Sequence, residues 1–335
     1  MTVRVAINGF GRIGRLVMRA LAESKRTDLQ VVGINDLGPV ATNAHLFKYD
    51  SVHGRYPGEV KIADGNIDFG AGPIRVTAER DPAKLPWKDL KVDIALECTG
   101  IFTKREQAAK HIEAGARRVL VSAPADGVDL TVVYGVNEDR LEAKHTVVSN
   151  ASCTTNCLAP VASVLHKAVG IERGFMTTVH AYTSDQSLVD TMHNNLGRAR
   201  AAALSMIPTT TGAAKAVGLV LPELKGKLDG TAIRVPTANV SMIDLKFVPS
   251  RKTTVEEINA AMEAASRENR LKGILAVNRE VLVSTDFNHD SHSSTFDLTQ
   301  TQVIDGTFVR VLSWYDNEWG FSNRMLDTAA AMGRL

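Results

Sequence analysis

The sequence predicts an α/β protein whose N-terminal part contains a parallel sheet and whose C-terminal part is α+β with a mixed, largely antiparallel sheet. A β-branched run over residues 3–7 leads through a glycine-rich turn into an amphipathic helical pattern that begins at Ile13. Strand and helix patterns then alternate to about residue 150, as a parallel sheet requires. Beyond residue 150 the strands are no longer regularly interleaved with helices, which favours the mixed or antiparallel arrangement.

The turn between the first strand and the first helix contains Gly9, Gly11 and Gly14, which have the spacing of a dinucleotide-binding loop. Gly9 permits the tight turn, Gly11 lets a pyrophosphate approach the backbone, and Gly14 lets the helix and strand pack closely. Asp36 ends the second strand, 22 residues after Gly14, where it can accept hydrogen bonds from a ribose. Because its charge would repel a 2′-phosphate, NAD is favoured over NADP. The first 150 residues are therefore predicted to form a Rossmann-type NAD-binding domain.

Further strands and one helix complete this first domain. Strand patterns cover residues 29–34, 92–97, 119–121, 131–135 and 146–148, and a helical pattern covers residues 104–114. In an open α/β sheet, ligands bind at the carboxyl ends of the strands. Thr99 and Ser122 stand at two such ends and are candidates for cofactor contact, although both residue types are also common in ordinary turns.

The second domain is predicted to span residues 151–316. It begins with a helix after Cys153 and contains strands over residues 175–180, 240–247 and 307–314, together with a capping box formed by Thr254 and Glu257. Residues 182–208 have little periodicity, which is typical of a functional or interfacial loop. A last helical pattern, within residues 317–335, is expected to pack on the first domain.

Cys153 is the strongest candidate nucleophile in the chain. It lies between Ser152 and Thr154 at the start of a predicted helix, where the helix dipole favours a thiolate and where free backbone N–H groups can bind an anion. A free cysteine is more often a small buried hydrophobe, and this interpretation is favoured for Cys98 and Cys157. Cys153 and Cys157 lack further ligands at zinc spacing and are poorly placed to form a disulfide, so no metal site is expected.

His180 follows Cys153 by 27 residues and ends a predicted strand before the irregular loop. A lone histidine is more often structural, but a thiol nucleophile needs a neighbouring base, and an imidazolium beside a thiolate lowers the pKa of the thiol. His180 is therefore a candidate acid/base residue.

Composition excludes several classes of protein. The chain has 335 residues, an ordinary apolar fraction of 44% and a formal net charge of +2, which is too small to indicate a nucleic-acid or membrane partner. Three cysteines in a chain of this length fit a reducing compartment, so a cytoplasmic location is expected. Neither a run of about 18 apolar residues nor room for a signal peptide before the first strand is present, so no membrane segment is expected.

These motifs together resemble the phosphorylating glyceraldehyde-3-phosphate dehydrogenases of bacteria. The matching stretches are residues 8–14, 151–157, 180–183, 208–214, 230–236 and 314–320, and the resemblance extends over essentially the whole chain. The run Ala-Ser-Cys-Thr-Thr-Asn at residues 151–156 is highly specific to this family and its nearest relatives.

The resemblance implies a role for each matching residue. Cys153 would be the nucleophile and His180 its activator. The NAD site would include Gly9, Gly11, Arg12, Ile13, Gly14, Asp36, Arg80, Thr99, Ser122 and Asn317, of which Arg12 and Ile13 would meet the pyrophosphate and Asn317 the nicotinamide carboxamide. Thr183 and Arg234, near Asp185, would hold the C3 phosphate of the substrate, and Ser152, Thr154, Arg198, Thr211 and Gly212 would serve inorganic phosphate or contact the substrate. Taken alone, Thr211 and Gly212 also fit a plain turn and Arg198 a solvated loop charge.

The implied reaction converts glyceraldehyde 3-phosphate, NAD and inorganic phosphate into an acyl phosphate through a hemithioacetal and a thioester on Cys153. The resemblance also implies a homotetramer without a primary nucleic-acid role. Two alternatives stay open. An erythrose-4-phosphate dehydrogenase would share the cysteine, the fold and the cofactor, whereas a non-enzymatic NAD-binding regulator would not need Cys153, His180 and two phosphate sites.

Overall fold

A computed structural model describes residues 2–335, and the contacts among them divide the chain into two compact units. The first unit runs to Tyr134 and also contains Glu138–Ser152 and Ser322–Leu335. The second unit contains Gly135–Asn137 and Cys153–Phe321. Within residues 2–335, none of the helices combines the length and the apolar character that crossing a bilayer requires.

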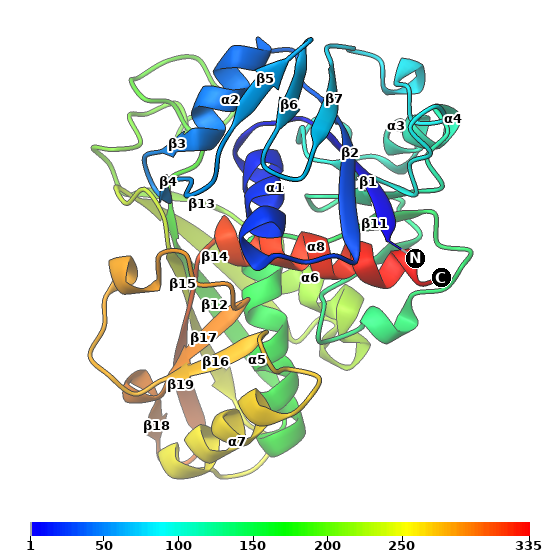
Figure 1. Cartoon of the computed structure of the whole chain (residues 1–335). Coiled ribbons are helices and arrows are strands. Elements are labelled where there is room, and N and C mark those ends of the chain that lie inside the picture. Colours follow the sequence, from blue (N-terminus) through cyan, green and yellow to red (C-terminus); the bar gives the residue numbers. More distant parts are fainter. Residues whose placement is uncertain (1) are drawn as a thin grey trace. The chain divides into compact units, whose positions relative to one another are not determined.

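The first unit is built on a sheet with the strand order β10-β11-β9-β8-β1-β2-β7-β6-β5 (Figure 1). Its strands are β1 (Val3–Asn8), β2 (Leu29–Asn35), β5 (Lys61–Ala63), β6 (Asn66–Asp68), β7 (Pro73–Thr77), β8 (Ile94–Glu97), β9 (Arg118–Val121), β10 (Leu130–Thr131) and β11 (Val147–Ser149). β6 pairs antiparallel with β5 on one side and with β7 on the other, whereas the pairs from β7 through β2 and β1 to β10 are parallel. Central strands of such a sheet are covered on both faces, which explains why the apolar residues of β1 and β8 are almost completely buried.

Helices and short turns connect these strands. They are α1 (Arg12–Ser24), α2 (Val40–Lys48), α3 (Arg105–Ala108), α4 (Lys110–Glu113), the 3-10 turns η1 (Pro82–Lys84) and η2 (Glu138–Arg140), and the hairpin of β3 (Tyr49–Asp50) and β4 (Gly54–Arg55). α2 packs beside β5 and β6, as Figure 1 shows. The C-terminal helix α8 (Trp319–Gly333) is tied to this unit by an ion pair between Asp327 and Arg26 and by a hydrogen bond from Thr328 to Asn150.

Two predicted elements of the first unit were wrong in extent. The helix expected over residues 104–114 is divided into α3 and α4 because the backbone tightens at Ala109, where the N–H of Ile112 donates to the Ala109 carbonyl three residues earlier. The strand expected over residues 131–135 is reduced to β10, and Gly135 adopts a positive φ of 88° that ends any extended run.

The second unit contains a sheet with the order β13-β14-β12-β15-β19-β17-β16, and β18 also pairs with β19. Its strands are β12 (Arg173–Ala181), β13 (Ile207–Thr210), β14 (Leu228–Val235), β15 (Ser241–Val248), β16 (Leu275–Asn278), β17 (Ser294–Asp297), β18 (Gln302–Ile304) and β19 (Phe308–Tyr315). The pairs β12–β14 and β16–β17 are parallel and the other pairs are antiparallel. The predicted α/β fold class, with a mostly parallel first sheet and a mixed, largely antiparallel second sheet, is therefore confirmed.

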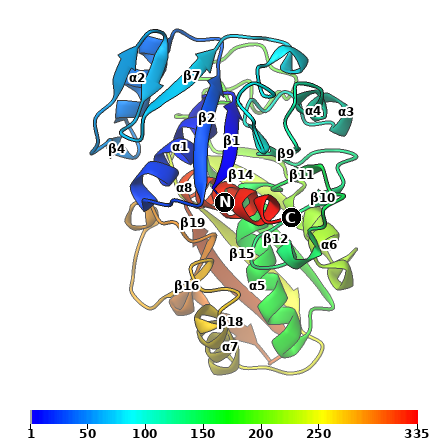
Figure 2. The same ribbon diagram turned by 45° about the vertical axis from the view of Figure 1, so that its right-hand side comes forward.

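The alternation seen in β15 explains how this second sheet is covered. Ile243, Leu245 and Phe247 are buried, whereas the residues between them are partly exposed. The covering helices are α5 (Cys153–Val169), α6 (Ala213–Val220) and α7 (Val255–Arg267), accompanied by the 3-10 turns η3 (Pro222–Leu224), η4 (Ser284–Phe287) and η5 (Leu298–Gln300). α5 packs against both α6 and α7, and Figure 2 shows α5 and α7 side by side.

Half of the predicted capping box forms at the start of α7. Thr254 Oγ1 accepts a hydrogen bond from the N–H of Glu257 at 3.3 Å. The Glu257 carboxylate pairs with Arg251 at 2.5 Å and accepts from Thr253 at 2.8 Å. Those two partners take the place of the backbone N–H of Thr254, so the reciprocal bond of the box is replaced.

Candidate functional site

Cys153 and His180 lie together in the second unit. Cys153 is the first residue of α5, and His180 is the penultimate residue of β12. The distance from Cys153 Sγ to His180 Nε2 is 3.5 Å, which is within hydrogen-bonding range for sulfur. His180 is only 4% exposed, so solvent does not compete freely for this contact.

Arg234 completes a group of three because β14 lies beside β12. The parallel register pairs His180 directly with Arg234, and residues paired in this way point to the same face of a sheet. Arg234 Nη1 lies 2.7 Å from His180 Nδ1 and 2.9 Å from the carbonyl oxygen of Ala181. Nδ1 is also 2.6 Å from that carbonyl. A guanidinium can only donate, so Nδ1 accepts from Arg234 when it carries no proton and donates to the Ala181 carbonyl when it does. In the second state Nε2 is the nitrogen left to exchange a proton with Cys153.

Tyr315 joins α5 to the sheet through a chain of hydroxyl groups. Its Oη lies 2.9 Å from Thr154 Oγ1 and 2.9 Å from Thr178 Oγ1. Because Thr178 donates to the carbonyl of Met242, it accepts from Tyr315, and Tyr315 in turn accepts from Thr154. The proton of the Thr154 hydroxyl is therefore already used, which leaves the backbone N–H of Thr154 as its donor to an external anion.

Burial and local charge act in opposite directions on the thiol. Burial is the larger effect and raises the pKa of Cys153, while the Arg234 charge and the hydrogen bond from the backbone N–H of Thr154 lower it. Burial, assisted by Arg234, lowers the pKa of His180 to about 3. A proton that passes from Sγ to Nε2 leaves the pair with no net charge, so internal transfer avoids the cost of burying a net charge.

The other two cysteines differ in their surroundings, since Cys98 is partly exposed and lines the cavity of the first unit, whereas Cys157 is buried. Burial raises the pKa of both Cys98 and Cys157 to about 12. Cys157 Sγ is 3.2 Å from Ser294 Oγ inside the second unit. These surroundings match the expectation that Cys157 packs in the core.

Several predicted anion-binding residues lie in the irregular segment after β12 and around β13. Arg198 pairs with Asp185 and donates to Thr209 at 3.1 Å, so it is not merely a solvated loop charge. The backbone N–H of Thr183 donates to Gln186 Oε1 at 3.3 Å. Thr211 and Gly212 directly precede α6. The Thr211 hydroxyl accepts from the N–H of Ala213, and a Cβ added at Gly212 would meet no atom within 4 Å.

The amide of Asn317 is oriented by Ser241. The hydroxyl of Ser241 donates to Asn317 Oδ1 at 2.8 Å and accepts from the backbone N–H of Ala181 at 3.0 Å. Because Oδ1 is the acceptor in this chain, the NH₂ group of Asn317 is the part of the amide available for a ligand. Ser241 is buried at a strand start and was not singled out from the sequence.

The first unit contains a cavity of about 360 Å³ at the carboxyl ends of β1, β2 and β8. It is lined by Asn8, Gly9, Gly11, Asn35, Asp36, Leu37, Glu79, Arg80, Cys98, Thr99, Ile101 and Phe102. Five predicted cofactor residues are therefore part of its wall. The remaining candidates from this unit lie on adjacent elements: Arg12, Ile13 and Gly14 in the first turn of α1, and Ser122 directly after β9.

The glycines of the loop differ in their surroundings as expected. Gly9 has a φ of 89°, and a Cβ at Gly14 would lie 2.1 Å from the carbonyl oxygen of Gly9. A Cβ at Gly11 would meet no atom within 4 Å, so the space beside this residue is open toward the cavity it lines. The geometry fits a ligand that approaches the loop at Gly11 and rests on the N-terminus of α1.

Asp36 and Arg12 also have partners within the protein. Asp36 accepts from the N–H of Phe10 at 2.8 Å, from the N–H of Gly38 at 2.8 Å and from Asn43 at 3.2 Å. A carboxylate offers about four acceptor positions, so Asp36 can hold the glycine loop and still accept from a ribose hydroxyl. Arg12 pairs with Asp50 at 2.5 Å, and this pairing holds its guanidinium beside the first turn of α1.

Sequence reasoning missed a group of buried polar residues beneath the cavity, which includes Asn8, Asn35, Glu97 and His111. Each of the first three ends a parallel strand, the position at which polar side chains most often serve a ligand. Tyr315 was also missed, because a tyrosine at the end of a strand has no distinctive sequence signal.

Comparison with known proteins gives two family matches. Residues 3–105 match the family described as glyceraldehyde 3-phosphate dehydrogenase, NAD binding domain. Residues 152–317 match the family described as glyceraldehyde 3-phosphate dehydrogenase, C-terminal domain. The second match begins next to Cys153 and ends at Asn317, so it includes the thiol, the imidazole and the Asn317 amide.

Similarity to characterised proteins extends over the full chain. It is 72% identical to a glyceraldehyde-3-phosphate dehydrogenase of Xanthobacter flavus and 68% identical to one of Cereibacter sphaeroides, each over 100% of both chains. It is also 59% identical to a glyceraldehyde-3-phosphate dehydrogenase of Geobacillus stearothermophilus, over 98% of each chain.

Proposed function

This chain belongs to the glyceraldehyde-3-phosphate dehydrogenase family and is an NAD-dependent dehydrogenase, and from that premise we propose that it converts glyceraldehyde 3-phosphate and inorganic phosphate into 1,3-bisphosphoglycerate in glycolysis or gluconeogenesis. The observation that carries the proposal is the 3.5 Å contact between Cys153 Sγ and His180 Nε2, with Arg234 beside it. A nucleophile, a base and a fixed positive charge are the groups that acyl transfer to phosphate needs.

Cys153 is proposed to attack the aldehyde carbon after its proton moves to His180 Nε2. The oxyanion formed in this attack can accept hydrogen bonds from the Cys153 N–H and from the protonated imidazole. The imidazolium then gives its proton to this oxygen, which completes the hydroxyl group of the hemithioacetal and leaves His180 neutral. When bound, NAD supplies the hydride acceptor for oxidation of the hemithioacetal carbon. His180 takes the hydroxyl proton as the thioester forms, and the carbonyl of Ala181 keeps Nδ1 oriented throughout. Attack by phosphate then forms the acyl phosphate and returns the thiolate.

Two groups of residues are proposed to bind phosphate. Arg234 and Thr183, near Asp185, would hold the C3 phosphate of the substrate. Inorganic phosphate would be bound by Ser152, Thr154, Arg198, Thr211 and Gly212. Thr154 would act through its backbone N–H because its hydroxyl donates to Tyr315. Among residues 2–335, Arg234 Nε is a buried donor without a protein partner, and this supports an anion at that side chain.

The cavity of the first unit is proposed as part of the NAD site. The pyrophosphate would contact the loop and helix start formed by Gly9, Gly11, Arg12, Ile13 and Gly14. The ribose would bind to Asp36, and the rest of the adenosine half would contact Arg80, Thr99 and Ser122. The NH₂ group of Asn317 would donate to the nicotinamide carboxamide. On this proposal residues 1–150 and the C-terminal helix form the NAD-binding domain, and residues 151–316 form the catalytic domain. The protein is further proposed to act in the cytoplasm as a homotetramer.

Phosphate dependence tests the reaction. In phosphate-free buffer the freshly reduced enzyme is expected to release a burst of about one NADH per subunit and then to slow, because the thioester accumulates. Added phosphate is expected to restore continuous turnover, measured by absorbance of NADH. Equally fast steady turnover without phosphate would contradict the thioester route, and better use of erythrose 4-phosphate would favour the four-carbon dehydrogenase.

Cofactor choice tests the role of Asp36. The protein is expected to use NAD at least about 100-fold more efficiently than NADP in kcat/KM, because the carboxylate repels a 2′-phosphate. Asp36→Asn removes the charge while keeping an oxygen acceptor for Phe10 or Gly38, and the preference should fall by tenfold or more. Similar efficiency with both cofactors in the unaltered protein would refute the role.

A further inference from the structure

Three buried polar side chains cross the first sheet where its central strands end. Asn35, Asn8 and Glu97 are the last residues of β2, β1 and β8, and they are 4%, 3% and 1% exposed. The parallel register pairs Asn8 with Asn35 on one side and with Glu97 on the other. Paired residues of parallel strands point to the same face, so the three form a continuous row.

Hydrogen bonds join this row from end to end. Asn35 Nδ2 donates to Asn8 Oδ1 at 2.7 Å, and Asn8 Nδ2 donates to Glu97 Oε2 at 2.7 Å. These two bonds fix which atom of the Asn8 amide is oxygen and which is nitrogen. The Glu97 carboxylate thereby receives a neutral donor in place of a cation.

His111, from α4, completes the row on the side of Glu97. It is 0% exposed, its Nδ1 lies 2.9 Å from Trp87 Nε1, and its Nε2 lies 2.9 Å from Glu97 Oε2. An indole N–H can only donate, so Nδ1 accepts and Nε2 carries the proton that is donated to Glu97. Trp87 therefore selects the tautomer of His111 that Glu97 requires.

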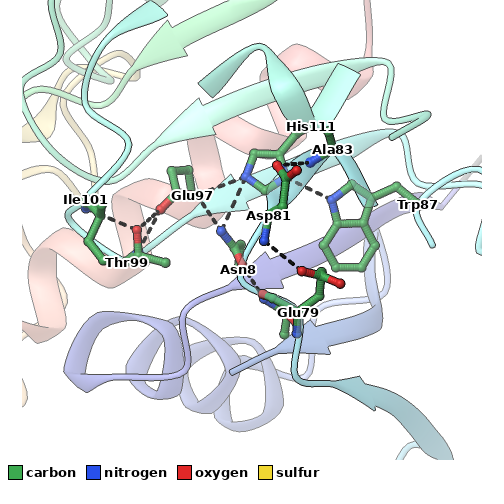
Figure 3. Close-up of polar contacts among 10 residues, drawn as sticks. Asn8, Glu79, Asp81, Ala83, Trp87, Glu97, Thr99, Ile101 and His111 are labelled. Atoms are coloured by element: carbon green, nitrogen blue, oxygen red, sulfur yellow. Dashed lines mark hydrogen bonds and ion pairs between the residues drawn. The ribbon is translucent and has the colours of Figure 1, made fainter. Parts of the chain in front are cut away.

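The network extends to residues that line the cavity. Figure 3 shows the contacts that lead from His111 and Asn8 through Glu97 to Thr99 and Ile101. On one side Glu97 Oε1 accepts from both the N–H, at 2.8 Å, and the hydroxyl of Thr99, and that hydroxyl accepts from the N–H of Ile101 at 3.1 Å. On the other side Asn35 accepts from the N–H of Glu79 and donates to its carbonyl, both at 2.8 Å. Glu79, Thr99 and Ile101 all line the cavity.

We propose that His111 is a positioning residue for NAD binding, although it does not line the cavity. Its Nε2–H holds the Glu97 carboxylate in the orientation that fixes the Thr99 wall, and Asn8 and Asn35 carry the same constraint to the Glu79 wall. Loss of that N–H leaves a buried carboxylate with one donor fewer, and Glu97 must turn away from Thr99 to recover one. The inference rests on the proposed assignment of this cavity to NAD.

Two substitutions at His111 separate positioning from packing. His111→Leu fills the space but offers no hydrogen bond, whereas His111→Gln offers one N–H donor for Glu97 and one carbonyl acceptor for Trp87. We expect His111→Leu to raise the Kd for NAD about tenfold, measured by titration calorimetry, with kcat at saturating NAD and KM for the aldehyde within about twofold of the unaltered protein. His111→Gln is expected to recover most of the affinity.

A double-mutant cycle tests whether His111 acts through Thr99. Thr99→Val removes the hydroxyl that Glu97 accepts, so His111→Leu should weaken NAD binding much less in that background than in the unaltered protein. Ile67→Ala, in a fully buried position on β6 away from the cavity lining, provides a variant that loses thermal stability without touching the network. It is expected to keep the original Kd for NAD.

Each contrary result has a defined meaning. An unchanged Kd in His111→Leu, or additive effects of His111→Leu and Thr99→Val, overturns the positioning role. An equal loss of affinity in Ile67→Ala and His111→Leu also overturns it, because general destabilisation would then explain both. Asp36→Asn serves as the reference for the site: if it also leaves NAD binding unchanged, the assignment of the cavity itself fails.

Discussion

Cys153→Ser is expected to lower turnover of glyceraldehyde 3-phosphate by at least about 10⁴-fold while leaving the Kd for NAD within about twofold. A serine hydroxyl keeps the size and the hydrogen-bonding capacity of the thiol, but it is a far weaker nucleophile and does not yield its proton to His180. The burst of NADH in phosphate-free buffer should disappear as well. Stopped-flow absorbance of NADH at saturating NAD measures the turnover and the burst.

Cys157→Ser is the matched control for this experiment. It lies one helical turn after Cys153 on α5, and a serine there can keep the contact with Ser294. It is expected to retain activity within about threefold. Dehydrogenase activity that persists in Cys153→Ser, or that disappears equally in Cys157→Ser, would show that Cys153 is not the nucleophile.

His180→Asn is expected to reduce kcat at neutral pH by about 10²- to 10⁴-fold, because the thiol loses the base that accepts its proton. It should also change the pH dependence of alkylation of Cys153 by iodoacetamide. Burial raises the pKa of the thiol, so without His180 the thiolate fraction is small at neutral pH and grows as the pH rises toward that pKa. The alkylation profile of the variant should therefore move at least about one pH unit to the alkaline side.

The unaltered protein provides the comparison, because its proton moves within the Cys153–His180 pair. In His180→Asn, the thermal unfolding temperature and the Kd for NAD should be close to those of the unaltered protein, since Arg234 keeps its hydrogen bond to the carbonyl of Ala181. An alkylation profile that coincides with that of the unaltered protein would exclude His180 as the base.

Much of the fold could be predicted because periodicity and glycine positions are local signals. The pattern Gly9, Gly11, Gly14 indicated both the first strand and the helix that follows it, and the close contact of Gly14 with Gly9 agrees with that interpretation. Cys153 was identifiable because hydroxyl residues flank it at the start of a helical pattern. The division of α3 from α4 was not predictable, because a tightened turn at Ala109 depends on backbone geometry that an alanine-rich run does not encode.

The candidate site required information that only the three-dimensional arrangement supplies. The contact between His180 and Arg234 depends on strand register across 54 residues, and the link from Thr154 to Tyr315 crosses 161 residues. The pKa of Cys153 also depends on how deeply the sulfur is surrounded, which helix position alone does not determine. His111 was not distinguishable from other histidines on a helix until Trp87 and Glu97 were found on either side of its ring.

The boundary between the two compact units falls between Ser152 and Cys153, directly before the nucleophile. The thiol, its imidazole, Arg234 and Tyr315 all belong to the stretch after this boundary, whereas Asp36 and the glycine loop belong to the stretch before it. Substitutions of Asp36 or of the glycine loop are therefore separated along the gene from substitutions around the reactive sulfur, whereas Asn317 lies on the same side as the sulfur. A single crossover at this junction between homologous genes would exchange Asp36 and the glycine loop, but it would leave Ser322–Leu335 of the first unit with the parent that supplies the second.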